Sequence, residues 1–226
     1  MMKPLVIAGN WKSNKTSEEA MEWLQNFQFS ISNFQLQNTS IILCASFTLL
    51  YPLKEEIKKQ SLPLVLGAQD ASAHPEGAYT GAVSVRQVKE LADWVIIGHS
   101  ERRKYFGEID EILAKKVEQA KLANLKIIYC VPDEQAVVPK GVDAVAYEPV
   151  WAIGTGKTDT PENANTAIAS LKQKFSISRV LYGGSVTPEN AASFVAQPAI
   201  DGVLVGGASL DALIFAALIR NICNQS

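Results

Sequence analysis

Eight short runs of apolar residues recur along the chain at fairly even intervals. The runs are continuous rather than alternating, which is typical of parallel strands covered on both faces. The predicted strands are 5–9, 41–45, 64–68, 94–98, 126–131, 144–148, 179–183 and 202–206. Most of the intervals carry apolar residues at the three-to-four spacing of a helix. The pattern therefore predicts a chain built from repeated βα units.

Helix starts and helix interiors can both be predicted from this spacing. Ser17 is the expected N-cap of the first helix. The tetrapeptide Thr-Pro-Glu-Asn occurs at 160–163 and again at 187–190, and it predicts two further helix starts. Other helices are expected at 49–60, 83–92 and 109–123.

Eight strands alternating with helices fit two architectures, a closed (βα)8 barrel and an open doubly wound sheet. The even spacing of the strands favours the α/β barrel, known as the TIM barrel. No linker rich in Pro, Gly or Ser divides the chain, so we assign residues 1–226 to one domain.

One βα unit is too short to be complete. Only 17 residues lie between Cys130 and Glu148, and the sixth strand takes part of them. The remainder contains Pro132, Pro139 and Gly141, which disfavour a helix of two or three turns. We therefore expect the fifth helix to be reduced or missing.

The composition narrows the class of protein. Of the 226 residues, 47% are hydrophobic and 19% are charged, which suits a folded core and argues against disorder. Lys and Arg number 21 against 23 Asp and Glu, so no nucleic acid or acidic membrane is expected as a partner. Three cysteines without a CxxC pair, no export signal and no long apolar run predict a reduced, cytoplasmic protein without a metal site.

Reactive side chains in a parallel βα architecture gather where the strands end. Lys12 follows the first strand, and a lysine there is costly unless it meets an anion. His99 follows the fourth strand and precedes Ser100, a helix-initiating residue, so its ring should lie at a positive helix end that disfavours the imidazolium. Glu148 ends the sixth strand before an apolar segment, where a carboxylate gains basic character.

Two further features point to a phosphorylated ligand. The segment after Glu148 runs from Pro149 to paired glycines, which predicts a lid. Glycine pairs after the last two strands, at 183–184 and 206–207, can turn backbone N–H groups toward one anion. A P-loop is excluded, because Trp151 stands where that motif requires glycine.

Each feature by itself also has a plain structural explanation: a solvated lysine, a buried histidine, a salt-bridged glutamate, or tight turns. Together they favour proton transfer between the carbons of a small phosphorylated carbonyl compound. Two alternatives remain open at this point. One is a Schiff-base aldolase built on Lys12. The other is a barrel without catalytic activity that serves as a binding or regulatory protein.

The motifs at the strand ends resemble those of the triosephosphate isomerase family, in order and over nearly the whole chain. They lie at 10–12, 98–103, 147–156, 182–185 and 205–207. The resemblance implies an aldose–ketose isomerase of glycolysis and gluconeogenesis that needs no cofactor and no metal. This family is itself a known example of a glutamate base paired with a neutral histidine and of lid closure.

The resemblance assigns a role to each residue of the site. Glu148 would remove a proton from dihydroxyacetone phosphate or glyceraldehyde 3-phosphate to give a cis-enediolate, and neutral His99 would move protons at its oxygens. Lys12 would offset negative charge and Asn10 would donate to the oxyanion. Glu101 would orient Lys12 without itself contacting the substrate.

The resemblance also implies how the phosphate is held. Backbone N–H groups of Gly154, Ser185, Gly206 and Gly207 would bind it. A lid would close over it and exclude water, and its residues are Pro149, Val150, Trp151, Ala152, Ile153, Gly154 and Thr155.

Members of the family are usually homodimers, and this chain departs from the family pattern near the interface. Thr80 would be the tip of a loop that reaches the partner's residues 10–12. Asp70 and Ala82 stand where the family commonly has Asn and Glu, so the resemblance does not fix the strength of the interface. Pro132-Asp133 replaces Gly-Glu, so we expect Asp133 to anchor the open lid less firmly at Trp151.

Overall fold

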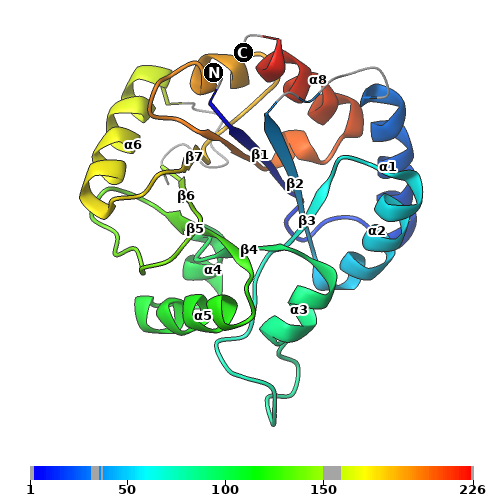
Figure 1. Cartoon of the computed structure of the whole chain (residues 1–226), viewed down its shortest axis with the longest axis vertical. Helices are drawn as coiled ribbons and strands as arrows, with labels where there is room; N and C mark the ends of the chain where they lie inside the picture. Colours follow the sequence, from blue (N-terminus) through cyan, green and yellow to red (C-terminus); the bar gives the residue numbers. More distant parts are fainter. Residues whose placement is uncertain (1–2, 32–35, 37, 150–158, 225–226) are drawn as a thin grey trace.

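Eight parallel strands close into a barrel, in sequence order, in the computed structural model of the chain (Figure 1). The structure describes residues 3–31, 36, 38–149 and 159–224. Because β1 pairs in parallel with both β2 and β8, the sheet has no free edge. The closed barrel is thereby confirmed over the open sheet. The strands are β1 Leu5–Asn10, β2 Thr39–Ala45, β3 Val65–Ala68, β4 Trp94–Ile97, β5 Lys126–Val131, β6 Ala144–Tyr147, β7 Val180–Tyr182 and β8 Gly202–Val205.

The continuous apolar runs are explained by two layers of packing. In β1, Val6 and Ala8 belong to the cluster inside the barrel, whereas Leu5 and Ile7 belong to the cluster between strands and helices. Both faces of each strand are therefore buried, and neither face tolerates a polar pattern. Polar residues stand mainly at the two ends of the strands, such as Thr39, Ser40 and Lys126 at the starts of β2 and β5 and Asn10 at the end of β1.

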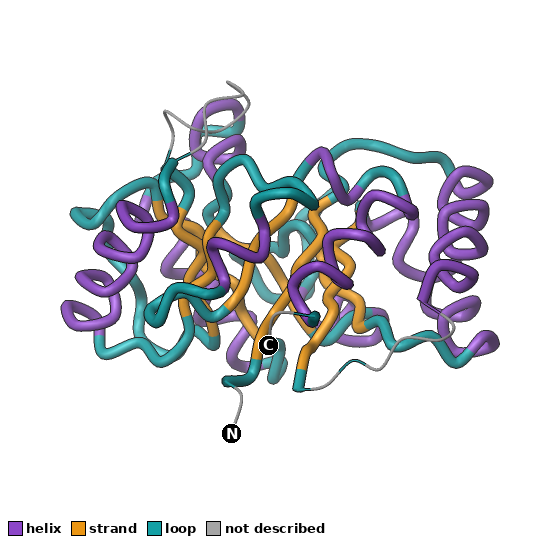
Figure 2. Tube along the Cα trace, turned by 90° about the horizontal axis from the view of Figure 1, so that it is seen from above, coloured by secondary structure: helices purple, strands orange, loops and turns teal. Residues whose placement is uncertain are grey.

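Helices surround the strands, as Figure 2 shows. α1 and α8 pack side by side, and α1 also packs on α2. The helices are α1 Ser17–Ile31, α2 Phe47–Gln60, α3 Val85–Leu91, α4 Ser100–Tyr105, α5 Asp110–Leu122, α6 Pro161–Phe175, α7 Ala191–Val195 and α8 Ala212–Cys223, with a 3₁₀ turn, η1, at Gly207–Ser209.

The helix caps correct one prediction. Thr16, rather than Ser17, caps α1: its hydroxyl accepts the Glu19 N–H, and the Glu19 carboxylate accepts the Thr16 N–H. A glutamate two residues after Ser17 could not close this reciprocal capping box, which needs a spacing of three. Thr160 caps α6 as predicted, by accepting the Asn163 N–H. The second Thr-Pro-Glu-Asn forms a turn, and α7 begins one residue later, at Ala191.

The fifth helix is missing, as predicted. Residues 132–143, all of them described, form only turns between β5 and β6. Lysines from the flanking helices hold this loop: Lys174 Nζ on α6 lies 2.7 Å from the Glu134 carbonyl, and Lys121 Nζ on α5 lies 3.3 Å from the Lys140 carbonyl. A short loop tied to its neighbours thus covers the barrel where a helix would normally lie.

The loop between β3 and α3 projects beyond the ring of helices (Figure 1). It carries Thr80, which is exposed. His74 and Tyr79 stack on one another within it, with ring centroids 4.3 Å apart.

The described helices include none long and apolar enough to cross a membrane.

Candidate active site

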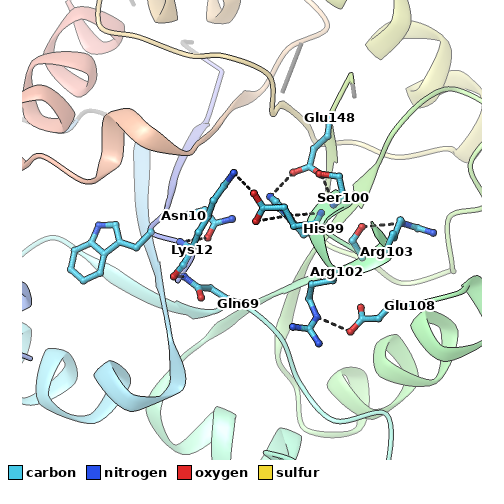
Figure 3. Close-up of polar contacts among 12 residues, drawn as sticks. Asn10, Lys12, Gln69, His99, Ser100, Arg102, Arg103, Glu108 and Glu148 are labelled. Atoms are coloured by element: carbon cyan, nitrogen blue, oxygen red, sulfur yellow. Dashed lines mark hydrogen bonds and ion pairs between the residues drawn. The ribbon is translucent and has the colours of Figure 1, made fainter. Parts of the chain in front are cut away.

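A cavity of about 360 Å³ opens at the carboxyl ends of the strands and brings together residues from five βα units. Figure 3 shows the side chains of Asn10, Lys12, His99 and Glu148 converging there. The cavity is lined by Asn10, Lys12, His99, Glu148, Gly183, Gly184, Ser185, Val186, Thr187, Leu204, Gly206, Gly207 and Ala208. Most of the predicted site residues therefore share one cavity, although they come from strand ends that are spread from β1 to β8.

Lys12 is fixed through its backbone as well as its side chain. Its φ of 55° lies in the left-handed region, which a lysine rarely adopts. The Asn10 side chain accepts the Lys12 N–H at 3.0 Å, and the Gln69 side chain donates to the Lys12 carbonyl at 2.9 Å. At the other end, Lys12 Nζ lies 2.6 Å from Glu101 Oε1. These contacts hold the Lys12 side chain at the cavity.

His99 is the N-cap of α4, and this position sets its tautomer. Its Nδ1 accepts the backbone N–H of Glu101 at 3.2 Å, so this nitrogen carries no proton. The proton of the neutral ring then lies on Nε2, which faces Glu148 Oε1 at 3.1 Å. His99 therefore lies at the start of α4, as expected, with its Nε2 turned toward Glu148.

Glu148 is 2% exposed and sits directly after β6. Its Oε2 accepts the Ser100 N–H at 3.0 Å, so the carboxylate meets the positive end of α4. Below it lies Cys130, whose pKa is raised well above the usual value by burial and by the neighbouring Glu148 charge. The thiol therefore stays protonated beneath the carboxylate. Sequence reasoning missed this contact, since nothing local marks Cys130.

The glycines at the end of β7 leave room for bulky neighbours. A Cβ on Gly183 would lie 3.0 Å from Glu148 Cγ, and one on Gly184 would lie 2.2 Å from the Tyr182 hydroxyl. Burial raises the pKa of Tyr182 to about 12, so the phenol under this turn stays neutral. The backbone of this turn can approach a ligand because no side chain occupies the space.

The arrangement combines a buried carboxylate, a neutral imidazole with its N–H toward the cavity, and an ammonium. Such a set can remove a proton from carbon while neighbouring groups stabilise the oxyanion that forms. In the part of the chain that the structure describes, no three metal-ligating side chains come together.

Comparisons with known proteins agree with this geometry. The family model described as triosephosphate isomerase matches residues 5–222. Triosephosphate isomerases of Endomicrobium trichonymphae and of a Synechococcus strain are 38% and 40% identical, each alignment covering 97% of this chain and 99% and 95% of the relative. A crystal structure of triosephosphate isomerase from Bartonella henselae superposes with a TM-score of 0.82 at 31% identity, covering 96% of this chain and 98% of that one.

The chain belongs to the triosephosphate isomerase family. The predictions of a TIM barrel and of an isomerase are therefore confirmed.

Some residues that the family resemblance assigns to the site lie elsewhere or outside the described residues. Thr80 is exposed and does not line the cavity of its own chain. The lid residues Val150, Trp151, Ala152, Ile153, Gly154 and Thr155 lie outside the described residues, whereas Pro149 is described and buried. Asp133 Oδ1 accepts the N–H groups of Gln135 and Ala136, so this oxygen stabilises the turn that replaces the fifth helix.

Asp70, a departure from the isomerase pattern, belongs to a buried group of four charges. Its carboxylate pairs with Lys116 on α5 and, at 2.8 Å, with Arg102 on α4. Glu108 Oε1 lies 2.6 Å from both of these cations. Burial raises the pKa of Asp70, whereas the two ion pairs oppose that rise. The sequence could not predict this group, because its members come from four segments: the loop after β3, α4, the loop between α4 and α5, and α5.

Proposed function

We propose that the chain interconverts dihydroxyacetone phosphate and D-glyceraldehyde 3-phosphate. The observation that carries the proposal is the placement of Glu148, His99 and Lys12 on one cavity, with Glu148 and His99 in direct contact at 3.1 Å. This reaction belongs to glycolysis and gluconeogenesis.

Glu148 acts as the base. Its carboxylate takes a proton from carbon 1 of dihydroxyacetone phosphate, the C–H electrons form a carbon–carbon double bond, and the carbonyl oxygen becomes an oxyanion. Return of a proton to carbon 2 of this cis-enediolate gives the aldehyde. The buried position of Glu148, 2% exposed, favours this role because few water molecules compete for the carboxylate.

His99, Lys12 and Asn10 stabilise the intermediate. His99 Nε2–H donates to the substrate oxygens, so its present contact with Glu148 gives way when substrate binds. Lys12 offsets the negative charge of phosphate and enediolate, and Glu101 keeps its ammonium in place. A neutral imidazole suits the task because it can give a proton to one oxygen and take one from the other.

Backbone N–H groups of Gly154, Ser185, Gly206 and Gly207 hold the phosphate, three of them on the wall of the described cavity. The lid from Pro149 to Thr155 closes over the site. Closure excludes water and prevents the enediolate from eliminating phosphate.

The chain acts as a cytoplasmic homodimer. The projecting loop with exposed Thr80 supports this proposal, since its tip is free to reach the partner's residues 10–12. Asp70 is paired within its own chain, so of the two departures from the family pattern only Ala82 bears on the interface.

A Schiff-base aldolase is the main enzymic alternative. It would need the Lys12 Nζ to be available for attack on a carbonyl, whereas Lys12 Nζ already pairs with Glu101 Oε1 at 2.6 Å. We therefore expect no lysine adduct when the protein is treated with borohydride and dihydroxyacetone phosphate.

A coupled assay for glyceraldehyde 3-phosphate tests the proposal directly. Purified protein should convert dihydroxyacetone phosphate without added cofactor or metal, and a phosphate-bearing enediolate analogue should inhibit it competitively. Absence of turnover would favour a barrel that only binds ligands, and a trapped adduct would favour the aldolase.

A further inference from the structure

Ser209, at the end of η1, is fully buried, and its carbonyl accepts hydrogen bonds from two tryptophans. The indole N–H of Trp11 donates to the Ser209 carbonyl at 3.0 Å, and that of Trp23 donates to the same oxygen at 3.1 Å. A carbonyl oxygen has two lone pairs, so both are used. Trp11 follows β1 and Trp23 lies on α1, whereas Ser209 follows β8. The first βα unit is thus joined to the end of the last strand through one atom, the Ser209 carbonyl oxygen.

Ser209 in turn fixes the peptide unit that joins Gly206 to Gly207. The Gly206 carbonyl accepts the Ser209 N–H at 2.9 Å and the Ser209 hydroxyl at 2.7 Å. In a planar trans peptide the N–H points opposite to the carbonyl. The N–H of Gly207 therefore points away from Ser209, and its direction depends on where Ser209 is held.

Ser209 has little freedom to move within this arrangement. A Cβ on Gly9 would lie 3.0 Å from Ser209 Cβ and 3.1 Å from the Phe215 ring, so glycine at this position lets Ser209 sit against β1. Trp23 is itself packed edge-on against Trp11, at 5.1 Å between centroids, and stacked on Phe27 at 4.9 Å. Packing therefore restrains both the Trp23 indole that donates and the Ser209 carbonyl that accepts.

We propose that Trp23, together with Trp11, is a positioning residue for the substrate phosphate. It acts from the outer helix α1 through the Ser209 carbonyl on the Gly207 N–H. This inference rests on the proposed function, in which Gly206 and Gly207 bind the phosphate. Trp23 does not touch the ligand, so it should affect phosphate affinity and leave the proton-transfer groups in place.

The test is a titration of ¹⁵N-labelled full-length protein with inorganic phosphate, following the Gly206 and Gly207 amide signals, alongside steady-state kinetics. Trp23→Phe keeps an aromatic ring and removes the N–H. We expect a rise of about three- to tenfold in the dissociation constant of phosphate and in KM, since one hydrogen bond to a buried carbonyl is lost. The value of kcat should stay within about twofold of the wild type.

Leu24→Ala provides the matched control, because Leu24 is a fully buried neighbour on the same helix. It should lower the thermal midpoint while leaving phosphate affinity and KM unchanged. Ser209→Ala, which removes the hydroxyl donor to Gly206, and Trp11→Phe should weaken phosphate binding as Trp23→Phe does.

Unchanged phosphate affinity in folded Trp23→Phe and Trp11→Phe would overturn the inference, as would an equal loss in Leu24→Ala. A wild-type protein whose Gly206 and Gly207 signals ignore phosphate would instead overturn the proposed phosphate site, and the inference with it. If Trp23→Phe does not fold, Trp11→Phe, which removes the other N–H donor to the Ser209 carbonyl, decides by the same measurement.

Discussion

The two sides of the cavity are built in different ways. At the ends of β1, β4 and β6, side chains face the ligand and fix one another, as in the contact between His99 and Glu148 or between Lys12 and Glu101. At the ends of β7 and β8, glycine backbone faces the ligand, and buried side chains beneath it, such as Tyr182 and Ser209, determine its shape. We call these the catalytic side and the phosphate side.

The difference predicts which kinetic constant changes when a residue on each side is substituted. A group on the catalytic side acts on charge that develops during the reaction, so its loss should lower kcat. A change on the phosphate side alters binding of a group that does not react, so it should raise KM. Variants on the two sides can therefore be told apart by kinetics.

The largest effect is expected for Glu148→Gln. The amide cannot accept the carbon-bound proton, so kcat should fall by about 10²–10⁴-fold with little change in KM. The coupled assay measures both values. Glu55→Gln, on the exposed surface of α2, should behave as the wild type. Near-normal turnover of Glu148→Gln would remove Glu148 as the base.

Lys12→Met is expected to have the second largest effect. It removes the ammonium that faces the oxyanion and the phosphate, so kcat/KM should fall by about 10²–10³-fold. Because Lys12 serves both sides of the cavity, kcat should fall and KM should rise together. Lys58→Met, an exposed lysine on α2, serves as control. A change in KM alone would assign Lys12 to the phosphate side only.

Gly184→Ala tests the phosphate side. The new Cβ would lie 2.2 Å from the Tyr182 hydroxyl and 2.5 Å from its ring carbon, so the turn or the ring must move. We expect a loss of about 1–3 kcal/mol in stability, measured by urea unfolding, and a clear rise in KM. Gly207→Ala, whose Cβ meets nothing within 4 Å, should leave stability unchanged. Equal stability of the two variants would contradict the close packing under Gly184.

The smallest effect at neutral pH concerns two buried weak acids of the barrel, Cys44 on β2 and Tyr182 on β7. Burial raises the pKa of Cys44 from 9.0 to about 12 and that of Tyr182 from 10.0 to about 12. Above about pH 9 the unfolded chain loses these protons while the folded chain keeps them, so stability falls as pH rises and is unaffected by these groups below pH 9.

Urea unfolding at pH 8 to 11 measures this loss. Cys44→Ala should make the decline shallower by up to about 1.4 kcal/mol per pH unit. Cys223→Ala should change it less, since Cys223 is only half buried. An identical decline in both variants would show that Cys44 ionises as easily in the folded protein as in the unfolded chain.

The catalytic side could be predicted from the sequence more fully than the phosphate side. Asn10, Lys12, His99 and Glu148 stand directly at strand ends, and parallel strands bring such residues to one rim. Gln69 and Cys130 were missed, because each acts on a residue from another βα unit. On the phosphate side, paired glycines predicted the cradle but not Tyr182 or the two indoles beneath it.

The fifth βα unit shows the same limit. The short spacing and Pro132 and Pro139 were enough to predict that the helix is missing. They did not predict what holds the loop, which is a pair of lysines, Lys121 and Lys174, from the helices on either side. The number of residues between two strands shows whether a helix can fit between them. The contacts that hold the loop in its place come from helices that lie beside it in the fold.

The sequence by itself determined the order of strands and helices, the closed barrel, the missing fifth helix and the residues at the strand ends. Each of these follows from local periodicity or from position relative to a strand. Only the tertiary structure decided the contact between His99 and Glu148, the partners of Lys12 and Asp70, and the hydrogen bonds from Trp11 and Trp23 to the Ser209 carbonyl. These depend on distances between elements far apart in the chain, which closure of the barrel sets and no local pattern encodes.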